Sequence, residues 1–195
     1  MIKPFEFYFD FGSPYTFLAH KQIRKIEKEN SIKIKYMPIL LGALLKATEI
    51  KSNIHIPIKG KYMVKDCKLC AEKNSIEFKF NNYFPIITLN LMRGALVANE
   101  KGFGQIFINK VFDAIWKDGL NLNDKSIVDK LLKNLDINPK TFLLESTNEN
   151  IKNELKNRTD DAHQKGIFGV PSFLVNNKLF WGQDRLEFAI NEAKK

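Results

Sequence analysis

The chain has 195 residues, 44% of them hydrophobic and 12% aromatic, and a formal net charge of +9 at pH 7. This length suits one domain, or one domain with an insertion, and the apolar content excludes wholesale disorder. No apolar run reaches the ~20 residues of a membrane span, and the N-terminus lacks a secretory or transit pattern. Two cysteines are too few for a disulfide scaffold, so we expect a soluble, cytoplasmic protein.

The positive charge does not by itself indicate a nucleic-acid partner. The 31 basic residues are 27 Lys and 4 Arg, and the Lys are spread along the whole chain. Readout of nucleic acids favours Arg, whose planar guanidinium bonds bidentately. We therefore expect no nucleic-acid role, and a charge that attracts anionic small molecules instead.

The first forty residues have the pattern of a β-α-β unit. Aromatic and polar residues alternate over 5–11, which predicts a strand with its four Phe on one face. Ser13 and Pro14 are typical of a helix start, and helical spacing continues to about residue 30. Alternation returns over 32–37 and predicts a second strand, parallel to the first.

The rest of the chain divides into a helical block and a short αββα ending. Helical patterns cover 40–48, 61–74, 88–101, 103–117, 124–134 and 139–157. Two strands, 172–175 and 178–181, flank Asn176-Asn177, a pair that tolerates a tight hairpin turn, and a last helix covers 184–193. We predict an α/β domain formed by 1–39 and 158–195, with 40–157 as an inserted all-helical domain.

Ser13 is the first candidate for chemistry. A hydroxyl at a helix N-terminus lies near unpaired backbone N–H groups and the positive end of the helix dipole. This environment stabilises a thiolate or a carboxylate. An ordinary N-cap is the alternative, and the turn alone does not decide between them.

Two further candidates lie near the C-terminus. A Pro just before a strand suggests that the Val170–Pro171 bond is cis and that Val170 offers its backbone groups to an extended ligand; the alternative is a trans turn. Asp184 either caps the last helix or accepts a hydrogen bond from a ligand amine.

The remaining reactive residue types show no metal-site spacing. Cys67 and Cys70 fall inside a helical pattern, with no second pair for zinc, so we predict two structural cysteines. His20 and His163 are predicted to lie on helix surfaces. No metal is expected.

Together, the terminal motifs resemble a known family. The segments 9–15, 168–173 and 180–186 are similar to the opening and closing motifs of 2-hydroxychromene-2-carboxylate isomerases and kappa-class glutathione transferases. The middle matches more loosely, at Asn53, 59–63, Phe84-Pro85 and Met92-Arg93. The resemblance covers essentially the whole chain. It implies a thioredoxin-like fold with an inserted helical domain, as in periplasmic thiol-disulfide oxidoreductases.

The resemblance also implies glutathione as the cofactor. Ser13 and Thr16 stand where redox relatives carry two cysteines, so Ser13 would instead donate a hydrogen bond to the glutathione sulfur and favour its thiolate. Gln183 and Asp184 would hold the γ-glutamyl end, and Lys59 a carboxylate. The implied glutathione-binding residues are Ser13, Pro14, Tyr15, Asn53, Lys59, Val170, Pro171, Trp181, Gly182, Gln183 and Asp184.

We therefore predict a glutathione-dependent isomerase, with Ser13 as its catalytic residue. Its partners would be glutathione, a small aromatic or conjugated acid and a second copy in a homodimer, without nucleic acid or membrane. One alternative is a kappa-class transferase that conjugates electrophiles. Others are a non-catalytic thioredoxin-fold module that binds a peptide or thiol, and disulfide exchange through Cys67 and Cys70.

Overall fold

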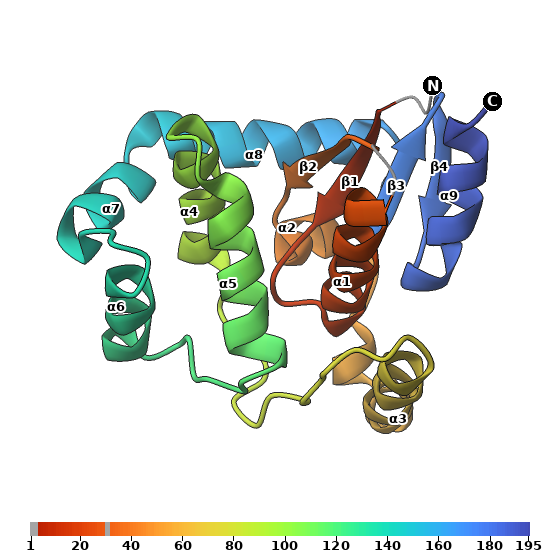
Figure 1. Cartoon of the computed structure of the whole chain (residues 1–195), viewed down its shortest axis with the longest axis horizontal. Coiled ribbons are helices and arrows are strands. Elements are labelled where there is room, and N and C mark those ends of the chain that lie inside the picture. Colours follow the sequence, from red (N-terminus) through yellow and green to blue (C-terminus); the bar gives the residue numbers. More distant parts are fainter. Residues whose placement is uncertain (1–3, 30–31) are drawn as a thin grey trace.

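The computed structural model describes residues 4–29 and 32–195 and contains one mixed four-stranded sheet (Figure 1). The strands are β1 (Phe5–Phe9), β2 (Ile34–Pro38), β3 (Ser172–Val175) and β4 (Lys178–Trp181), in the order β2-β1-β3-β4. β1 pairs with β2 in parallel, which confirms the β-α-β prediction, and β3 pairs antiparallel with β1 and β4. Asn176 and Asn177 form the hairpin turn with positive φ angles of 48° and 61°.

Helices surround this sheet. Their bounds are α1 (Pro14–Glu29), α2 (Leu41–Ala47), α3 (Pro57–Lys73), α4 (Leu89–Glu100), α5 (Gly104–Trp116), α6 (Lys125–Lys133), α7 (Pro139–Ser146), α8 (Glu149–Gln164) and α9 (Leu186–Ala193), with short 3-10 turns at Asn53–His55 and Gln183–Arg185. Figure 1 shows α4 to α7 gathered to one side of the sheet, with α8 running from α7 back to the strands. The predicted end of the first helix, near residue 30, lies outside the described residues. No helix in the described ranges is long and apolar enough to cross a membrane.

The helix predicted over 139–157 is wrong, because two helices occupy this stretch. Thr147 and Asn148 separate α7 from α8. The Asn148 side chain accepts a hydrogen bond from the Asn150 N–H at 2.8 Å, and the Thr147 hydroxyl donates to the Leu143 carbonyl. Such local bonds compete with helix continuation, so a new helix begins after Asn148 and continues to Gln164.

The core contains the aromatic face of β1. Phe5, Phe7, Phe9 and Phe11 are all buried, as the alternation predicts. Phe112 of α5 packs against this face, with its ring centroid 5.9 Å from that of Phe9 and 4.8 Å from that of Phe11. One buried cluster therefore includes strands and inserted helices. The division into two domains stays a prediction, and its limit at 157/158 falls inside α8.

His20 is fully buried, so its predicted place on a helix surface is wrong. Its ring stacks on Phe112 at 4.8 Å, and Nδ1 lies 3.0 Å from the Tyr36 hydroxyl. Burial lowers the pKa of His20 to about 3, with a smaller contribution from the nearby Lys21 ammonium. His163, in contrast, is exposed as predicted.

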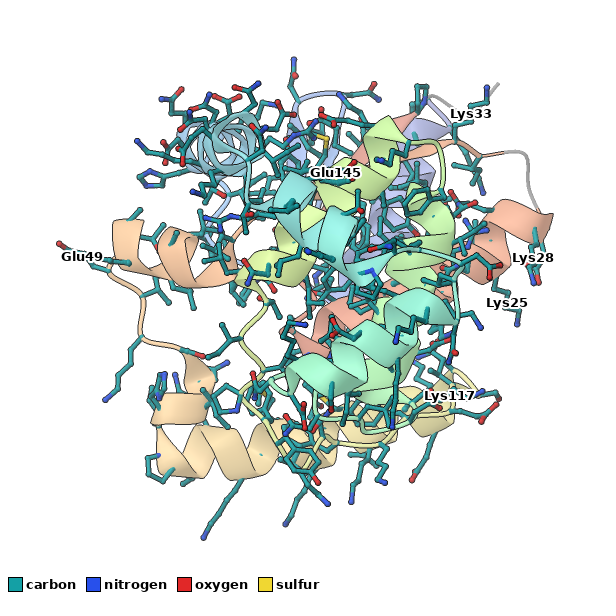
Figure 2. All side chains as sticks on the ribbon, turned by 90° about the vertical axis from the view of Figure 1, so that its left-hand side faces the viewer. Lys25, Lys28, Lys33, Glu49, Lys117 and Glu145 are labelled. Carbon is teal, nitrogen blue, oxygen red and sulfur yellow. The ribbon has the colours of Figure 1, made fainter. Side chains whose placement is uncertain are left out.

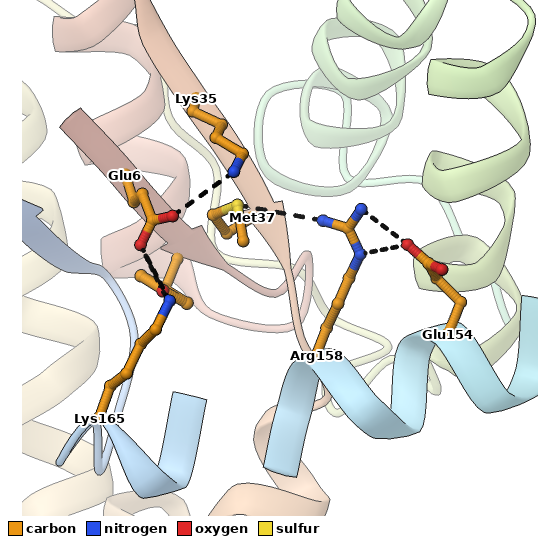
Figure 3. A network of polar contacts seen from close by, with 7 residues as sticks. Glu6, Lys35, Met37, Glu154, Arg158 and Lys165 are labelled. Carbon is orange, nitrogen blue, oxygen red and sulfur yellow. Dashed lines mark hydrogen bonds and ion pairs between the residues drawn. The ribbon is translucent and has the colours of Figure 1, made fainter. Parts of the chain in front are cut away.

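Polar contacts join α8 to the sheet edge (Figure 3). Glu6 of β1 lies 3.6 Å from the Lys35 ammonium and 3.4 Å from that of Lys165, and it accepts a 2.6 Å hydrogen bond from the Tyr8 hydroxyl. Arg158 of α8 pairs with Glu154 at 2.7 Å. The Arg158 guanidinium also points to Sδ of Met37 in β2 at 3.9 Å, so Arg158 and Lys165 connect α8 and the residue after it to the sheet. None of these contacts involves the turn before α1.

Candidate functional site

The turn between β1 and α1 places Ser13 at a helix N-terminus. Pro14 is the first residue of α1, and Ser13 Oγ accepts a hydrogen bond from the Thr16 N–H at 3.2 Å. The same oxygen lies 3.5 Å from the Val170 carbonyl oxygen, to which it donates. Ser13 is thus an N-cap and also the point where the N-terminal and C-terminal motifs meet.

The Val170–Pro171 peptide bond is cis, which confirms the prediction. The Pro171 carbonyl accepts a hydrogen bond from the Gly182 N–H at 2.9 Å. The rings of Phe168 and Trp181 lie 4.8 Å apart, and Trp181 remains half exposed. The segments 168–173 and 180–184 therefore pack together as one wall beside Ser13.

Gly169 and Gly182 allow this close packing. A Cβ at Gly169 would lie 2.7 Å from Nε1 of Trp181. Gly182 has a φ of 111° and would bring a Cβ within 2.6 Å of Oδ1 of Asp184. Other residues at either position would push the Trp181 ring or the Asp184 carboxylate away.

The Asp184 carboxylate is exposed and does not cap a helix. A 3-10 turn occupies Gln183–Arg185, and α9 begins at Leu186, so the last helix starts two residues later than predicted. Oδ2 of Asp184 accepts a 2.8 Å hydrogen bond from the adjacent Arg185. The cap interpretation of Asp184 therefore does not hold, and its role toward a ligand stays a prediction.

The Gln183 side chain is held between two helices. Its oxygen accepts from Nε2 of Gln22 in α1 at 3.1 Å, and its nitrogen donates to Sγ of Cys70 in α3 at 3.2 Å. One amide N–H remains for a ligand. Sequence reasoning missed both partners, since Gln22 and Cys70 are far from Gln183 in the chain.

The two cysteines are free thiols inside α3. Burial raises the pKa of Cys67 to about 12 and, together with the Asp66 and Asp184 carboxylates, also raises that of Cys70. Neither thiol is then a thiolate near neutral pH, which disfavours disulfide exchange. The neighbouring Asp66 accepts a 2.7 Å hydrogen bond from the Tyr15 hydroxyl, and burial together with Asp66 raises the tyrosine pKa.

Asn53 and Lys59 have no polar contact with this wall within the described residues. Asn53 lies in the 3-10 turn before α3, Lys59 lies in the first turn of α3, and both are exposed. Within residues 4–29 and 32–195, neither side chain forms a hydrogen bond or an ion pair. Their role in the site therefore stays a prediction.

Asp10 is a buried charged residue that sequence reasoning did not single out. Its carboxylate accepts hydrogen bonds from the Gly12 N–H (2.9 Å), the Thr88 hydroxyl (2.7 Å) and the Leu41 N–H (2.8 Å). Burial raises the pKa of Asp10, and the three hydrogen bonds oppose that shift. Its position in a strongly aromatic strand could have indicated this role, because a carboxylate in such a place is buried and needs hydrogen-bond donors around it.

A cavity of about 620 Å³ lies apart from Ser13, between α1 and the end of α3. Lysines line it, among them Lys21, Lys25 and Lys117, and Figure 2 shows Lys25 and Lys117 on the same edge of the molecule. Lys21 pairs with Asp113 and Lys117 with Glu77, so part of this positive charge is already neutralised. The described residues contain no group of three or more His, Cys, Asp or Glu side chains that could hold a metal.

The fold and the cis-proline wall beside a helix N-terminus define a thioredoxin-like protein. Residues 5–192 match the model of the DsbA-like thioredoxin domain, and the chain belongs to this family. It is 26% identical to a 2-hydroxychromene-2-carboxylate isomerase of Sphingobium xenophagum over 190 residues, 96% of each chain. It is also 26% identical to glutathione S-transferase kappa 2 of Caenorhabditis elegans, over 94% of this chain and 88% of that protein.

Solved structures agree with this fold. A 2-hydroxychromene-2-carboxylate isomerase superposes with a TM-score of 0.86 at 24% identity, covering 95% of this chain and 91% of that one. A probable DsbA oxidoreductase from Streptomyces coelicolor gives 0.74 at 13% identity, over 98% and 89%. The named sequence relatives are isomerases and glutathione transferases, so the chain belongs to a group of enzymes.

Proposed function

We propose that the protein is a glutathione-dependent isomerase of the 2-hydroxychromene-2-carboxylate isomerase type. The observation that carries this proposal is the Ser13 hydroxyl at the N-terminus of α1, 3.5 Å from the Val170 carbonyl that precedes the cis proline. A hydroxyl cannot take part in dithiol exchange, but it can donate to a bound thiolate. The isomerase relatives, with which the chain aligns over nearly its full length, support the same reaction.

Glutathione fits the charges along the wall beside Ser13. Its cysteinyl backbone would pair with the backbone of Val170, as in strand addition. Its ammonium would pair with the exposed Asp184, and a carboxylate with Lys59 across the site. Gln183 would contribute the amide N–H that Gln22 and Cys70 leave free.

The reaction needs the thiolate at two moments. The thiolate adds to a conjugated carbon of the substrate, a single bond of the anionic adduct then rotates, and departure of the same thiolate restores the double bond in the other geometry without net oxidation or reduction. The Ser13 hydroxyl would turn from the Val170 carbonyl to the sulfur, favouring the thiolate in attack and in departure. Positioning and electrostatics supply the rest of the catalysis.

Conjugation of electrophiles is the second candidate. It uses the same thiolate without the elimination step, and the kappa glutathione transferase relatives favour it. Assays of conjugation and of isomerisation on the same preparation separate the two. Glutathione binding with neither activity would instead indicate a non-catalytic binding module.

The test is Ser13→Ala, with Ser146→Ala as the matched control. Ser146 is also buried, but it lies in α7 and donates to the Leu143 carbonyl. We expect Ser13→Ala to raise the pKa of bound glutathione, seen in the ultraviolet absorbance of the thiolate. The variant should also lose roughly 2–4 kcal/mol of transition-state stabilisation, as when an oxyanion donor is removed, and its turnover should fall accordingly. Ser146→Ala should change neither quantity, and full turnover in Ser13→Ala would refute the role of Ser13.

A further inference from the structure

Phe11, the third residue before α1, is held by side chains from the helical part of the chain. The Phe11 carbonyl accepts a 2.7 Å hydrogen bond from Nε1 of Trp116 in α5. The Phe11 N–H points to Sδ of Met92 in α4 at 3.5 Å. Residues 92 and 116 are thus in direct contact with the turn that ends at Ser13, although they are far from it in sequence.

Asp10 holds the rest of this turn. Its carboxylate accepts from the Gly12 N–H at 2.9 Å, and its backbone carbonyl accepts from the Ser13 N–H at 3.2 Å. The carboxylate is itself fixed by the Thr88 hydroxyl at 2.7 Å and the Leu41 N–H at 2.8 Å. The turn is therefore linked through Asp10 to the starts of both α2 and α4.

The Thr88 side chain bonds Asp10 and not the start of its own helix. It occupies the N-cap position of α4, where a threonine hydroxyl usually accepts from a helix N–H, but its side chain makes no cap hydrogen bond. The hydroxyl donates to Asp10 instead. A buried carboxylate is costly unless it is hydrogen-bonded, so the Thr88 hydroxyl offsets part of the cost of burying Asp10 and fixes the position of its carboxylate.

We propose that Asp10, Thr88 and Trp116 are positioning residues for the Ser13 hydroxyl. Through them the helical part of the chain sets where the hydroxyl meets the glutathione sulfur. This inference rests on the proposed function. None of the three side chains needs to touch glutathione, which would bind to the separate wall formed by 168–173 and 180–184. Their loss should therefore lower kcat more than it raises the KM for glutathione.

The experiment compares Thr88→Val with Thr88→Ser and Thr159→Val. Valine keeps the shape of threonine without the hydroxyl, and serine keeps the hydroxyl. Thr159 is a second buried threonine, whose hydroxyl bonds Leu155 and Leu40 but not the Ser13 turn. Thr88→Val should lower kcat with chlorodinitrobenzene, a general electrophile, by about tenfold. It should also raise the pKa of bound glutathione, whereas Thr88→Ser and Thr159→Val should stay near the wild type in both readouts.

A second readout does not depend on glutathione. Amide hydrogen exchange at Gly12 and Ser13, measured by NMR on the free protein, should speed up by about tenfold in Thr88→Val and not in Thr159→Val. If Thr88→Val matches Thr159→Val in kcat, thiol pKa and exchange, the positioning proposal is wrong. If the wild type shows no thiolate signal with glutathione, the proposed function fails instead. The exchange rates alone then decide whether Thr88 and Asp10 hold the turn.

Discussion

A neutral histidine lies in the aromatic core at position 20. Helical spacing places it on the same face as Phe17 and Ile23, which are both fully buried, so its burial could have been predicted from the sequence. The surface prediction followed from the residue type, because a histidine can carry a charge, whereas the helical spacing indicated burial. In the structure Phe112 and Tyr36 surround the ring, and the lowered pKa keeps it uncharged.

Burial of His20 predicts a specific loss of stability in acid. The folded-state pKa is about 3 against an ordinary value of 6.5, so between these pH values the unfolded state binds one more proton than the folded state. The free energy of unfolding should then fall on acidification from pH 6.5 towards 3, by up to about 1.4 kcal/mol per pH unit.

His20→Phe tests this by removing the proton site while keeping a ring on Phe112. Urea unfolding at several pH values should give a variant whose stability falls less steeply below pH 6.5. The raised pKa of Asp10 acts in the opposite direction, but it is common to both proteins and cancels in the difference. Parallel stability curves would show that His20 is not the titrating group.

Substitution of Asp184 and of Lys59 should lower the affinity for glutathione by unequal amounts. Asp184→Ala removes the carboxylate proposed for the glutathione ammonium, and a charge-assisted hydrogen bond contributes about 1.5–3 kcal/mol, so the affinity should fall roughly tenfold or more. Lys59→Ala should weaken binding less, because an exposed lysine is screened by salt. Calorimetric titration at fixed salt measures both. Glu187→Ala, an exposed acidic residue in α9, is the control.

At the scale of elements, the sequence predicted most helices and strands to within a few residues. One exception comes from polar residues that bond the nearby backbone, and another from a proline. Thr147 and Asn148 split one predicted helix into α7 and α8. Pro57 begins α3 four residues earlier than predicted, because proline is favoured at the first position of a helix.

The N-cap of α8 at Asn148 should contribute measurably to the free energy of unfolding. Asn148 accepts from the Asn150 N–H at 2.8 Å, so Asn148→Ala should lower the free energy of unfolding by about 1 kcal/mol. Asn148→Asp keeps an oxygen acceptor and should retain most of the stability. Urea denaturation compares the two variants. Equal stability of Asn148→Ala and the wild type would mean that the cap contributes nothing.

At the scale of the molecule, the sequence predicted the Ser13 turn and the cis proline of the candidate site, but not the long-range hydrogen bonds that fix the residues around them. Ser13 and Val170–Pro171 could be predicted because the residues next to them in the sequence are typical of a helix start and of a turn before a strand. Other hydrogen bonds could not be predicted, because each joins residues far apart in the chain. They link Thr88 with Asp10, Trp116 with Phe11, and Gln183 with both Gln22 and Cys70. Only the folded arrangement of the helices around the sheet brings such pairs together.

These long-range contacts predict that the sheet and the inserted helices unfold together. Phe112 packs on Phe9 and Phe11, and Trp116 is fully buried and bonded to the Phe11 carbonyl. Separating the helices from the sheet would expose this aromatic cluster to water, so a half-unfolded state should be too costly to accumulate.

The two tryptophans of the chain lie on either side of this interface and allow the test. In Trp181→Phe, fluorescence reports on Trp116 in α5, and in Trp116→Phe it reports on Trp181 in β4. Within each variant, the urea midpoint from fluorescence should coincide with that from far-ultraviolet circular dichroism, even though the loss of the buried Trp116 lowers both midpoints of its variant. Separate midpoints within Trp181→Phe would show that the predicted insertion unfolds on its own. In that case the shared aromatic core would not couple the helices to the sheet.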